Sequence, residues 1–194
     1  MVITFTGHRP QKLGGYDYDN DTNSITKNFF GYSITHIYCT NPETDLHFIT
    51  GGALGFDQMM FDVCYRCKQI MQNNITIELA IPFKEQPKLW RYEDICRYEK
   101  HKRQADIVTY VDTVDGYKFS GVPIGKYHIE KMQLRNMYMV DKGDLLFSCW
   151  DGTKGGTCNC VNYAKKQKHI TNVNYSPESI LSSIPKNDDD DEIL

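Results

Sequence analysis

Three glycine-rich segments carry the residues whose types and spacing could do chemistry. They are Thr6-Gly7-His8-Arg9, Thr50-Gly51-Gly52-Ala53-Leu54-Gly55, and the stretch from Trp150 to Gly155-Gly156-Thr157. Each follows a short apolar run that is typical of a β-strand. A glycine-rich turn between a strand and a helix exposes backbone N–H groups at the positive end of the helix dipole, which favours a phosphate. The three segments together predict a site for an anionic small molecule.

Two common phosphate-binding patterns do not describe these segments. None has the G-x-G-x-x-G spacing of a dinucleotide fingerprint or the G-x-x-x-x-G-K-[ST] spacing of a P-loop. No lysine directly follows Gly155 and Gly156 to hold a γ-phosphate. Ordinary dinucleotide redox chemistry and nucleoside triphosphate hydrolysis are therefore disfavoured.

The polar side chains of the first two segments each have two interpretations. Arg9 suits a phosphate or carboxylate because its planar fork pairs bidentately with oxyanions, or it forms a salt bridge that pins the loop. His8 could donate to a phosphate and titrate near neutral pH, or make only local hydrogen bonds. Asp57, in the first turn of a helix, would repel a phosphate, so it suits ribose hydroxyls or caps the helix. The ligand-binding glycines predicted here are Gly7, Gly51, Gly52 and Gly55.

The third segment is predicted to form a second phosphate cradle. Gly155 and Gly156 would supply N–H groups, and Thr157 would act as the N-cap of the helix that follows. Asp151, two residues past the strand, is the best-placed acid beside this cradle. It could polarise a water or a ribose hydroxyl, or simply close an Asx turn. Asp151 and Asp57 are therefore the two candidate catalytic acids.

Two further pairs are candidate ligand contacts. Arg135 and Asn136 are neighbours on a predicted helix and could reach a base edge or a phosphate. Trp90 could stack on a base while Gln86 hydrogen-bonds it, although a buried Trp is more often part of the core.

Cys64 and Cys67 have C-x-x-C spacing, but they lie within an amphipathic helix without a second pair, so we expect small apolar side chains and no metal site.

The elements that must position these residues alternate between strands and helices, which predicts an α/β fold with a mostly parallel sheet. The expected strands are Val2–Thr6, Leu46–Thr50, Thr76–Ile81, Asp106–Val111, Asp144–Cys149 and His169–Asn174. The expected helices are Ser24–Tyr38, Phe56–Gln72, Pro87–Gln104, Tyr127–Val140 and Thr157–Gln167. In such a sheet, loops at the carboxyl ends of the strands converge where the strand order reverses.

Two segments lie outside this alternation. The long glycine-containing stretch Asp112–Gly125 is predicted to be a loop of the kind that often serves as a lid. Residues 177–194 are rich in Ser, Pro and Asp, which predicts an acidic, disordered tail after a single domain at residues 1–176. The length of 194 residues suits one domain.

Composition narrows the function classes. Net charge is −3, and without the five acids of 188–192 the chain carries 22 basic and 20 acidic residues, so a general nucleic-acid coat is disfavoured. No apolar run approaches the roughly 20 residues that span a bilayer, so no membrane partner is expected. Seven Cys is an odd count, which we interpret as reduced thiols in a cytoplasmic protein without a signal peptide.

An ordered set of motifs carries a family resemblance. From the N-terminus the set comprises Thr6-Gly7-His8-Arg9-Pro10 with Leu13-Gly14-Gly15-Tyr16, Thr50 to Asp57, Pro82-Phe83 with Gln86 and Trp90, Arg97-Tyr98 with Ala105-Asp106, Arg135-Asn136 with Asp141, and Asp151-Gly152 with Gly155-Gly156-Thr157. The set resembles the SLOG superfamily and, within it, the YpsA-like branch. It covers most of the chain, from residue 4 to about residue 164.

The resemblance implies a Rossmann-like three-layer α/β/α fold that binds nucleotides or nucleotide-derived ligands. Relatives in the superfamily include cytokinin-activating phosphoribohydrolases, DprA-type DNA-processing proteins and sensors of ADP-ribose-derived signals. Relatives are commonly dimers or larger, so the resemblance implies a homodimer or higher homo-oligomer for this chain. The phosphoribohydrolases resemble P-G-G-x-G-T-x-x-E, with a catalytic Glu after the glycines. Here Thr157 is followed by Cys158, Asn159, Cys160, Val161 and Asn162, so that acid is missing.

Three functional hypotheses follow. The first is binding of a nucleoside phosphate or ADP-ribose-like molecule with cleavage of its N-glycosidic bond, without a cofactor. The second is a non-catalytic sensor or sequestering protein for such a nucleotide, which the missing Glu favours. The third is a DprA-like DNA-processing protein, which the near-neutral charge disfavours.

Overall fold

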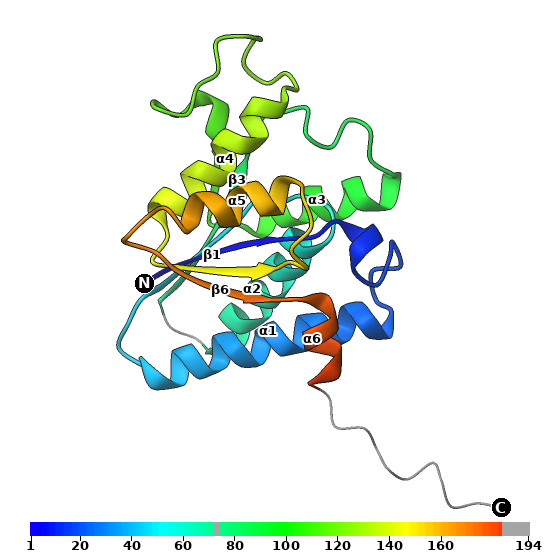
Figure 1. Cartoon of the computed structure of the whole chain (residues 1–194), viewed down its shortest axis with the longest axis vertical. Coiled ribbons are helices and arrows are strands. Elements are labelled where there is room, and N and C mark those ends of the chain that lie inside the picture. The colour runs from blue at the N-terminus through cyan, green and yellow to red at the C-terminus, as the bar shows by residue number, and fades with distance from the viewer. Residues whose placement is uncertain (72–73, 184–194) are drawn as a thin grey trace, which may run out of the picture.

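Six parallel strands form one sheet, in the order β4-β3-β2-β1-β5-β6 (Figure 1). The computed structural model describes residues 1–71 and 74–183. The expected mostly parallel sheet is confirmed, since every strand pair runs parallel. The strands are β1 Val2–Gly7, β2 Leu46–Thr50, β3 Ile75–Ile81, β4 Ile107–Tyr110, β5 Leu145–Cys149 and β6 Thr171–Tyr175.

Helices cover both faces of the sheet and complete the Rossmann-like three-layer arrangement. Helices α1, α2 and α6 lie on one face, α3 packs against α2, and α4 and α5 lie together on the other face (Figure 1). Their bounds are α1 Asp21–Thr40, α2 Phe56–Met71, α3 Tyr92–Gln104, α4 Ile129–Lys142, α5 Gly156–Ala164 and α6 Pro177–Ser182. Short 3-10 turns occupy Pro10–Lys12 and Val111–Thr113. No helix within the described ranges has the length and apolarity to cross a membrane.

The packing of the core shows why the apolar runs of the sequence form strands. Phe5 and Phe147, on neighbouring strands, stack at 6.1 Å between ring centroids, and Phe30 of α1 packs edge-on against Phe147 at 5.8 Å. All three side chains are buried. Strands covered on both faces need near-continuous apolar residues, and the runs at β1, β2, β3 and β5 provide them.

The strand order reverses beside β1, and this positions the site. The chain builds β1 to β4 outward on one side and then returns to place β5 on the other side of β1. Gly7 is paired with Cys149, so the loops that follow β1 and β5 leave the sheet side by side. Such a switch point opens a crevice at the carboxyl ends of the strands.

Two predicted helix starts are wrong. Helix α3 begins at Tyr92 rather than at Pro87, because the chain between them folds into successive turns in which Trp90 N–H donates to Pro87 O at 3.0 Å. Proline fits the start of a turn as well as the start of a helix, so its position did not discriminate. Helix α5 begins at Gly156 with Gly155 as N-cap, so Thr157 lies inside the helix instead of capping it.

The C-terminal boundary also differs from the prediction. Residues 177–182 form α6, capped by the Ser176 hydroxyl, which accepts from Ser179 N–H at 3.1 Å. Ile180 is fully buried in the main core, next to α1. These residues therefore belong to the domain that was expected to end at 176. The acidic run 188–192 lies outside the described residues.

The segment predicted as a lid is anchored to α4. Lys131 of α4 and Asp112 form an ion pair at 2.9 Å, and both side chains are only 1% exposed. Lys131 Nζ also donates to Pro123 O at 2.8 Å, and Asp112 accepts from Gly125 N–H at 2.7 Å. Two buried charges and their hydrogen bonds therefore fix both ends of the loop.

Replacing Lys131 by Met should destabilise the protein strongly. Removing one partner of a buried ion pair leaves an uncompensated charge and costs about 3–5 kcal/mol. For a chain of this size that corresponds to a fall in Tm of roughly 6–20 °C in thermal denaturation followed by circular dichroism. The matched control is Lys118→Met, whose partner Asp115 is exposed, and we expect its Tm to stay within about 2 °C of wild type. A Lys131→Met protein as stable as this control would show that the pair does not anchor the loop.

Candidate functional site

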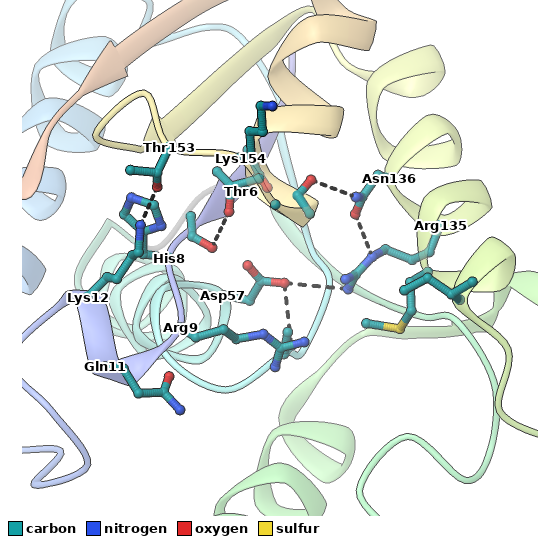
Figure 2. Close-up of a pocket in the computed structure, with 17 residues that line it drawn as sticks. Thr6, His8, Arg9, Gln11, Lys12, Asp57, Arg135, Asn136, Thr153 and Lys154 are labelled. Carbon is teal, nitrogen blue, oxygen red and sulfur yellow. Dashed lines mark hydrogen bonds and ion pairs between the residues drawn. The ribbon is translucent and has the colours of Figure 1, made fainter.

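A cavity of about 410 Å³ lies at the switch point between β1 and β5. Its walls come from the loop after β1, the first turn of α2, helix α4 and the start of α5 (Figure 2). Of the predicted site residues, it brings together Gly7, His8, Arg9, Asp57, Arg135, Asn136, Gly155, Gly156 and Thr157. Cavities of this size typically hold small-molecule ligands.

A buried ion pair crosses the floor of this cavity. Arg135 Nη1 of α4 lies 3.4 Å from Asp57 Oδ2 of α2, and both side chains are less than 10% exposed. Arg135 also donates from Nη1 to Gly51 O, and from Nε to Asn136 Oδ1 at 3.0 Å. Arg135 is thereby fixed by three partners, which positions it as part of the floor.

Asp57 presents one carboxylate oxygen to the cavity. Within the described residues, its contacts with Arg135 and with Ala53 N–H, both at 3.4 Å, run through Oδ2. Burial raises the pKa of Asp57, and the charges of Arg135 and Arg9 oppose that shift. Oδ1 is therefore available to accept from a ligand hydroxyl, in a site where two guanidinium groups lie close by.

Asp151 holds two loops together behind the cavity wall. Its Oδ1 accepts from Thr153 N–H at 2.9 Å and lies 2.8 Å from His8 Nε2, while Oδ2 lies 3.3 Å from Lys12 Nζ. The hydrogen bonds from Thr153, followed by the charge of His8 and the hydrogen bond from Lys12, hold the pKa of Asp151 well below its ordinary value. These are the contacts of an Asx turn, and Asp151 is not among the described residues that line the cavity. Its role as a catalytic acid stays a prediction.

His8 connects the first loop to the third. Its buried side chain accepts at Nε2 from Asp151 N–H at 3.0 Å. Burial lowers the pKa of His8, and the neighbouring Asp151 carboxylate opposes that shift. These contacts of Nε2 with the main chain and the carboxylate of Asp151 keep the loops after β1 and β5 in register.

The start of α5 faces the cavity with open main chain. Gly155 has φ 151°, in the region that favours glycine, and a Cβ added at Gly156 would meet nothing within 4 Å. The first hydrogen bond at this end runs from Asn159 N–H to Gly155 O at 3.0 Å, so the preceding N–H groups have no intrahelical acceptor. Thr157 Oγ1 donates to Gly7 O at 2.8 Å and ties the helix to β1.

The second glycine segment packs against its neighbours, and ligand binding by Gly51, Gly52 and Gly55 stays a prediction. Phe56 N–H donates to His8 O at 3.1 Å, and Ala53 N–H donates to Asp57, so these donors are already used. A Cβ at Gly55, which has φ 91°, would lie 2.6 Å from His8 O. Gly51 lies against Arg135 and Asp57, and Gly52, which has φ 64°, lies against Leu79 and Tyr98. Within the described chain, none of these three glycines lines the cavity.

A smaller cavity of about 220 Å³, here called the annex, adjoins the first and shares Arg9 and Met132 with it. Trp90 lines the annex and packs edge-on against Tyr98, with ring centroids 5.3 Å apart. Gln86 also lines it, but its Nε2 donates to Gly51 O at 3.3 Å and its Oε1 accepts from Tyr98 O–H at 3.1 Å. The Gln86 amide therefore holds the second glycine segment, and its predicted hydrogen bond to a base is not favoured.

Several lining residues were missed by the sequence analysis. Met132 lies three residues before Arg135 and shares its helical face, a spacing that was visible in the sequence. Lys154 lies within the third glycine segment, and its charge was a second available signal. Lys12 is different: it reaches the cavity because the 3-10 turn Pro10–Lys12 folds it back, which no local pattern indicated.

Cys64 and Cys67 lie outside both cavities described above. Cys64 and Cys67 are buried in α2 as part of the main core. Burial raises the pKa of both thiols, so they stay protonated near neutral pH. This matches the interpretation of the pair as small apolar side chains.

Comparison with known proteins places the chain in a family. The family model described as "YspA SLOG family" matches residues 3–182. The chain is 42% identical over 127 residues to the "Uncharacterized SPbeta prophage-derived protein YoqJ" of Bacillus subtilis, covering 64% of this chain and 72% of that protein. It is 27% identical over 173 residues to a UPF0398 protein of Bacillus cereus strain G9842, covering 88% of this chain and 86% of the relative. The chain belongs to the YspA SLOG family.

Proposed function

We propose that the cavity binds a phosphate-bearing, nucleotide-derived ligand. The observation that carries this proposal is the start of α5, where Gly156 leaves open main chain on the cavity wall. Unsatisfied N–H groups and the positive end of a nine-residue helix favour an oxyanion there. Arg9 lines the same cavity and supplies a charge that pairs with phosphate oxygens.

The remaining features divide the site into three zones for such a ligand. Asp57 Oδ1 is an acceptor in the cavity and suits a ribose hydroxyl better than a second anion. The annex, lined by Phe83, Trp90 and Tyr127, offers aromatic surface for a base. An anion zone, an acceptor zone and an aromatic zone correspond to the phosphate, ribose and base of a nucleotide. Family membership supports the same class of ligand.

Hydrolysis of an N-glycosidic bond is a second candidate, favoured by the position of Asp57. Cleavage passes through a ribosyl centre with oxocarbenium character, which a carboxylate stabilises. Asp57 lines the cavity, whereas both oxygens of Asp151 are occupied by Thr153, His8 and Lys12. A carboxyl with a raised pKa is also suited to proton transfer with a water molecule. Without such turnover, the same site serves a sensor or sequestering protein.

Arg9→Ala should weaken phosphate-ligand binding and leave the fold intact. Loss of a charge-assisted hydrogen bond lowers affinity by roughly tenfold to over a hundredfold. The measurement is calorimetric titration of AMP, GMP and ADP-ribose into wild type and variant. Arg103→Ala, at the exposed end of α3, is the matched control and should bind as wild type does. Equal affinities for the Arg9 variant and wild type would refute the site.

Gly156→Ala tests the main-chain contact itself. A methyl group here meets no protein atom, so Tm should remain within about 2 °C of wild type. The methyl would instead occupy space beside the N–H groups, and we expect at least a roughly tenfold loss of affinity for ribose 5-phosphate. Gly31→Ala in α1, where a Cβ also fits, is the control and should not alter binding. Full affinity in the Gly156 variant would place the phosphate elsewhere.

Base release separates the two candidate functions and the two candidate acids. We expect Asp57→Asn to abolish any release of free base from nucleoside monophosphates or NAD, because Asn cannot carry the charge that a ribosyl cation requires. Because Asp57 also pairs with Arg135, the result counts only if the variant still binds ribose 5-phosphate and unfolds cooperatively. Asp151→Asn should retain release, measured by chromatography over hours, at a rate within about tenfold of wild type. Wild type that binds but releases no base would exclude hydrolysis of these substrates. Release by the Asp57 variant at the wild-type rate would exclude Asp57 as the acid.

A further inference from the structure

The annex has the volume and the lining of a pocket that can hold an aromatic ring. A water molecule takes roughly 30 Å³ in the liquid, and the annex volume of about 220 Å³ suits a larger group. Phe83 is buried and packs edge-on against Tyr127 at 5.5 Å between centroids. Tyr127 and Leu89 are 63% and 92% exposed, so apolar surface remains uncovered beside the annex. Aromatic and aliphatic walls of this kind bind the faces of a base.

One wall of the annex carries a carboxylate next to an ammonium group. Glu85 and Lys88 both line the annex, with Lys88 Nζ 3.8 Å from Glu85 Oε1. Lys126 Nζ also lies 2.6 Å from Oε1. The hydrogen bond from Lys126 lowers the pKa of Glu85, so its side chain is an ionised acceptor at neutral pH. Within the described chain, Glu85 Oε2 is engaged by neither lysine.

Gln86 does not compete for this role. Its amide is committed to Gly51 and Tyr98, as described above. Arg9 and Lys88 are donors only, so Glu85 provides the charged acceptor of the annex. A base that docks here meets an acceptor and a donor side by side.

We infer that the annex selects a guanine-type base and that Glu85 reads its N–H edge. Guanine presents N1–H and the N2 amino group as adjacent donors, with O6 as an acceptor beside them. A carboxylate accepts from both donors, and Lys88 can donate to O6. Adenine has an acceptor at N1, which a carboxylate repels, and one amino group. This inference rests on the proposed function and names the ligand class of the same site.

Equilibrium binding of three nucleotides to the full chain tests the inference. GMP, IMP and AMP differ at N1, the 6-position and N2 while sharing ribose and phosphate. We expect GMP to bind at least about tenfold more tightly than AMP, since a good bidentate contact discriminates bases by that order. IMP, which keeps N1–H and O6 but lacks the N2 amino group, should fall between them. Binding of AMP that equals or exceeds that of GMP would overturn the inference.

The variant Glu85→Gln removes the charge and one acceptor while keeping the shape of the side chain. We expect it to lose the preference for GMP over AMP while binding ribose 5-phosphate as wild type does, because this probe has no base. Glu93→Gln, an exposed position in the first turn of α3, is the matched control and should keep the preference. A preference that survives in Glu85→Gln would overturn the role of Glu85.

Failure of this inference is distinguishable from failure of the proposed function. Equal binding of GMP and AMP that Arg9→Ala weakens would reject guanine selection and leave the phosphate site standing. If neither the three nucleotides nor ribose 5-phosphate bind wild type, both proposals fall together.

Discussion

The ion pair between Arg135 and Asp57 is the constraint on which the site depends. It joins α4 on one face of the sheet to α2 on the other, across the carboxyl ends of the strands. A buried charge requires a partner and satisfied hydrogen bonds, and Arg135 obtains them from Asp57, Gly51 and Asn136. Because a side chain at Gly51 would collide with the guanidinium, the glycine there is set by the ion pair. The second glycine segment is thus a support for the cavity floor.

With that floor fixed, the groups beside each helix terminus differ in how well they suit an anion. At the start of α2, Ala53 N–H donates to the Asp57 carboxylate and Phe56 N–H donates to the His8 carbonyl. At the start of α5, the Thr157 hydroxyl donates to the Gly7 carbonyl. The main chain of Gly156 lines the cavity, and no protein atom lies within 4 Å of the place where a Cβ would be. Two helix termini that look alike in sequence therefore present different groups to the cavity, a carboxylate at α2 and open main chain at α5. The acidic Asp57 at the first and the open glycine at the second are consistent with a ribose beside α2 and a phosphate beside α5.

Much of the fold followed from local pattern, because buried parallel strands need continuous apolar runs and glycines mark the turns after them. The Rossmann-like sheet and the convergence of the first and third loops were predictable for this reason. The pairing of Asp57 with Arg135 was not, since 78 positions separate them and each side chain alone has several ordinary roles. The role of Gln86 was equally hard to predict from the sequence. An amide side chain suits a base, but this amide donates to Gly51 O and accepts from Tyr98 O–H. The start of α3 was missed because Pro87 fits a turn and a helix equally well.

The proposed phosphate contact lies at the amino end of α5. Titration of ribose 5-phosphate into ¹⁵N-labelled protein, followed by amide NMR, observes that contact directly. We expect the largest shifts at the amides of Gly156 and Thr157, with smaller shifts in the first loop at His8 and Arg9. Saturable shifts concentrated at Ala53 and Phe56, with Gly156 and Thr157 unmoved, would contradict it.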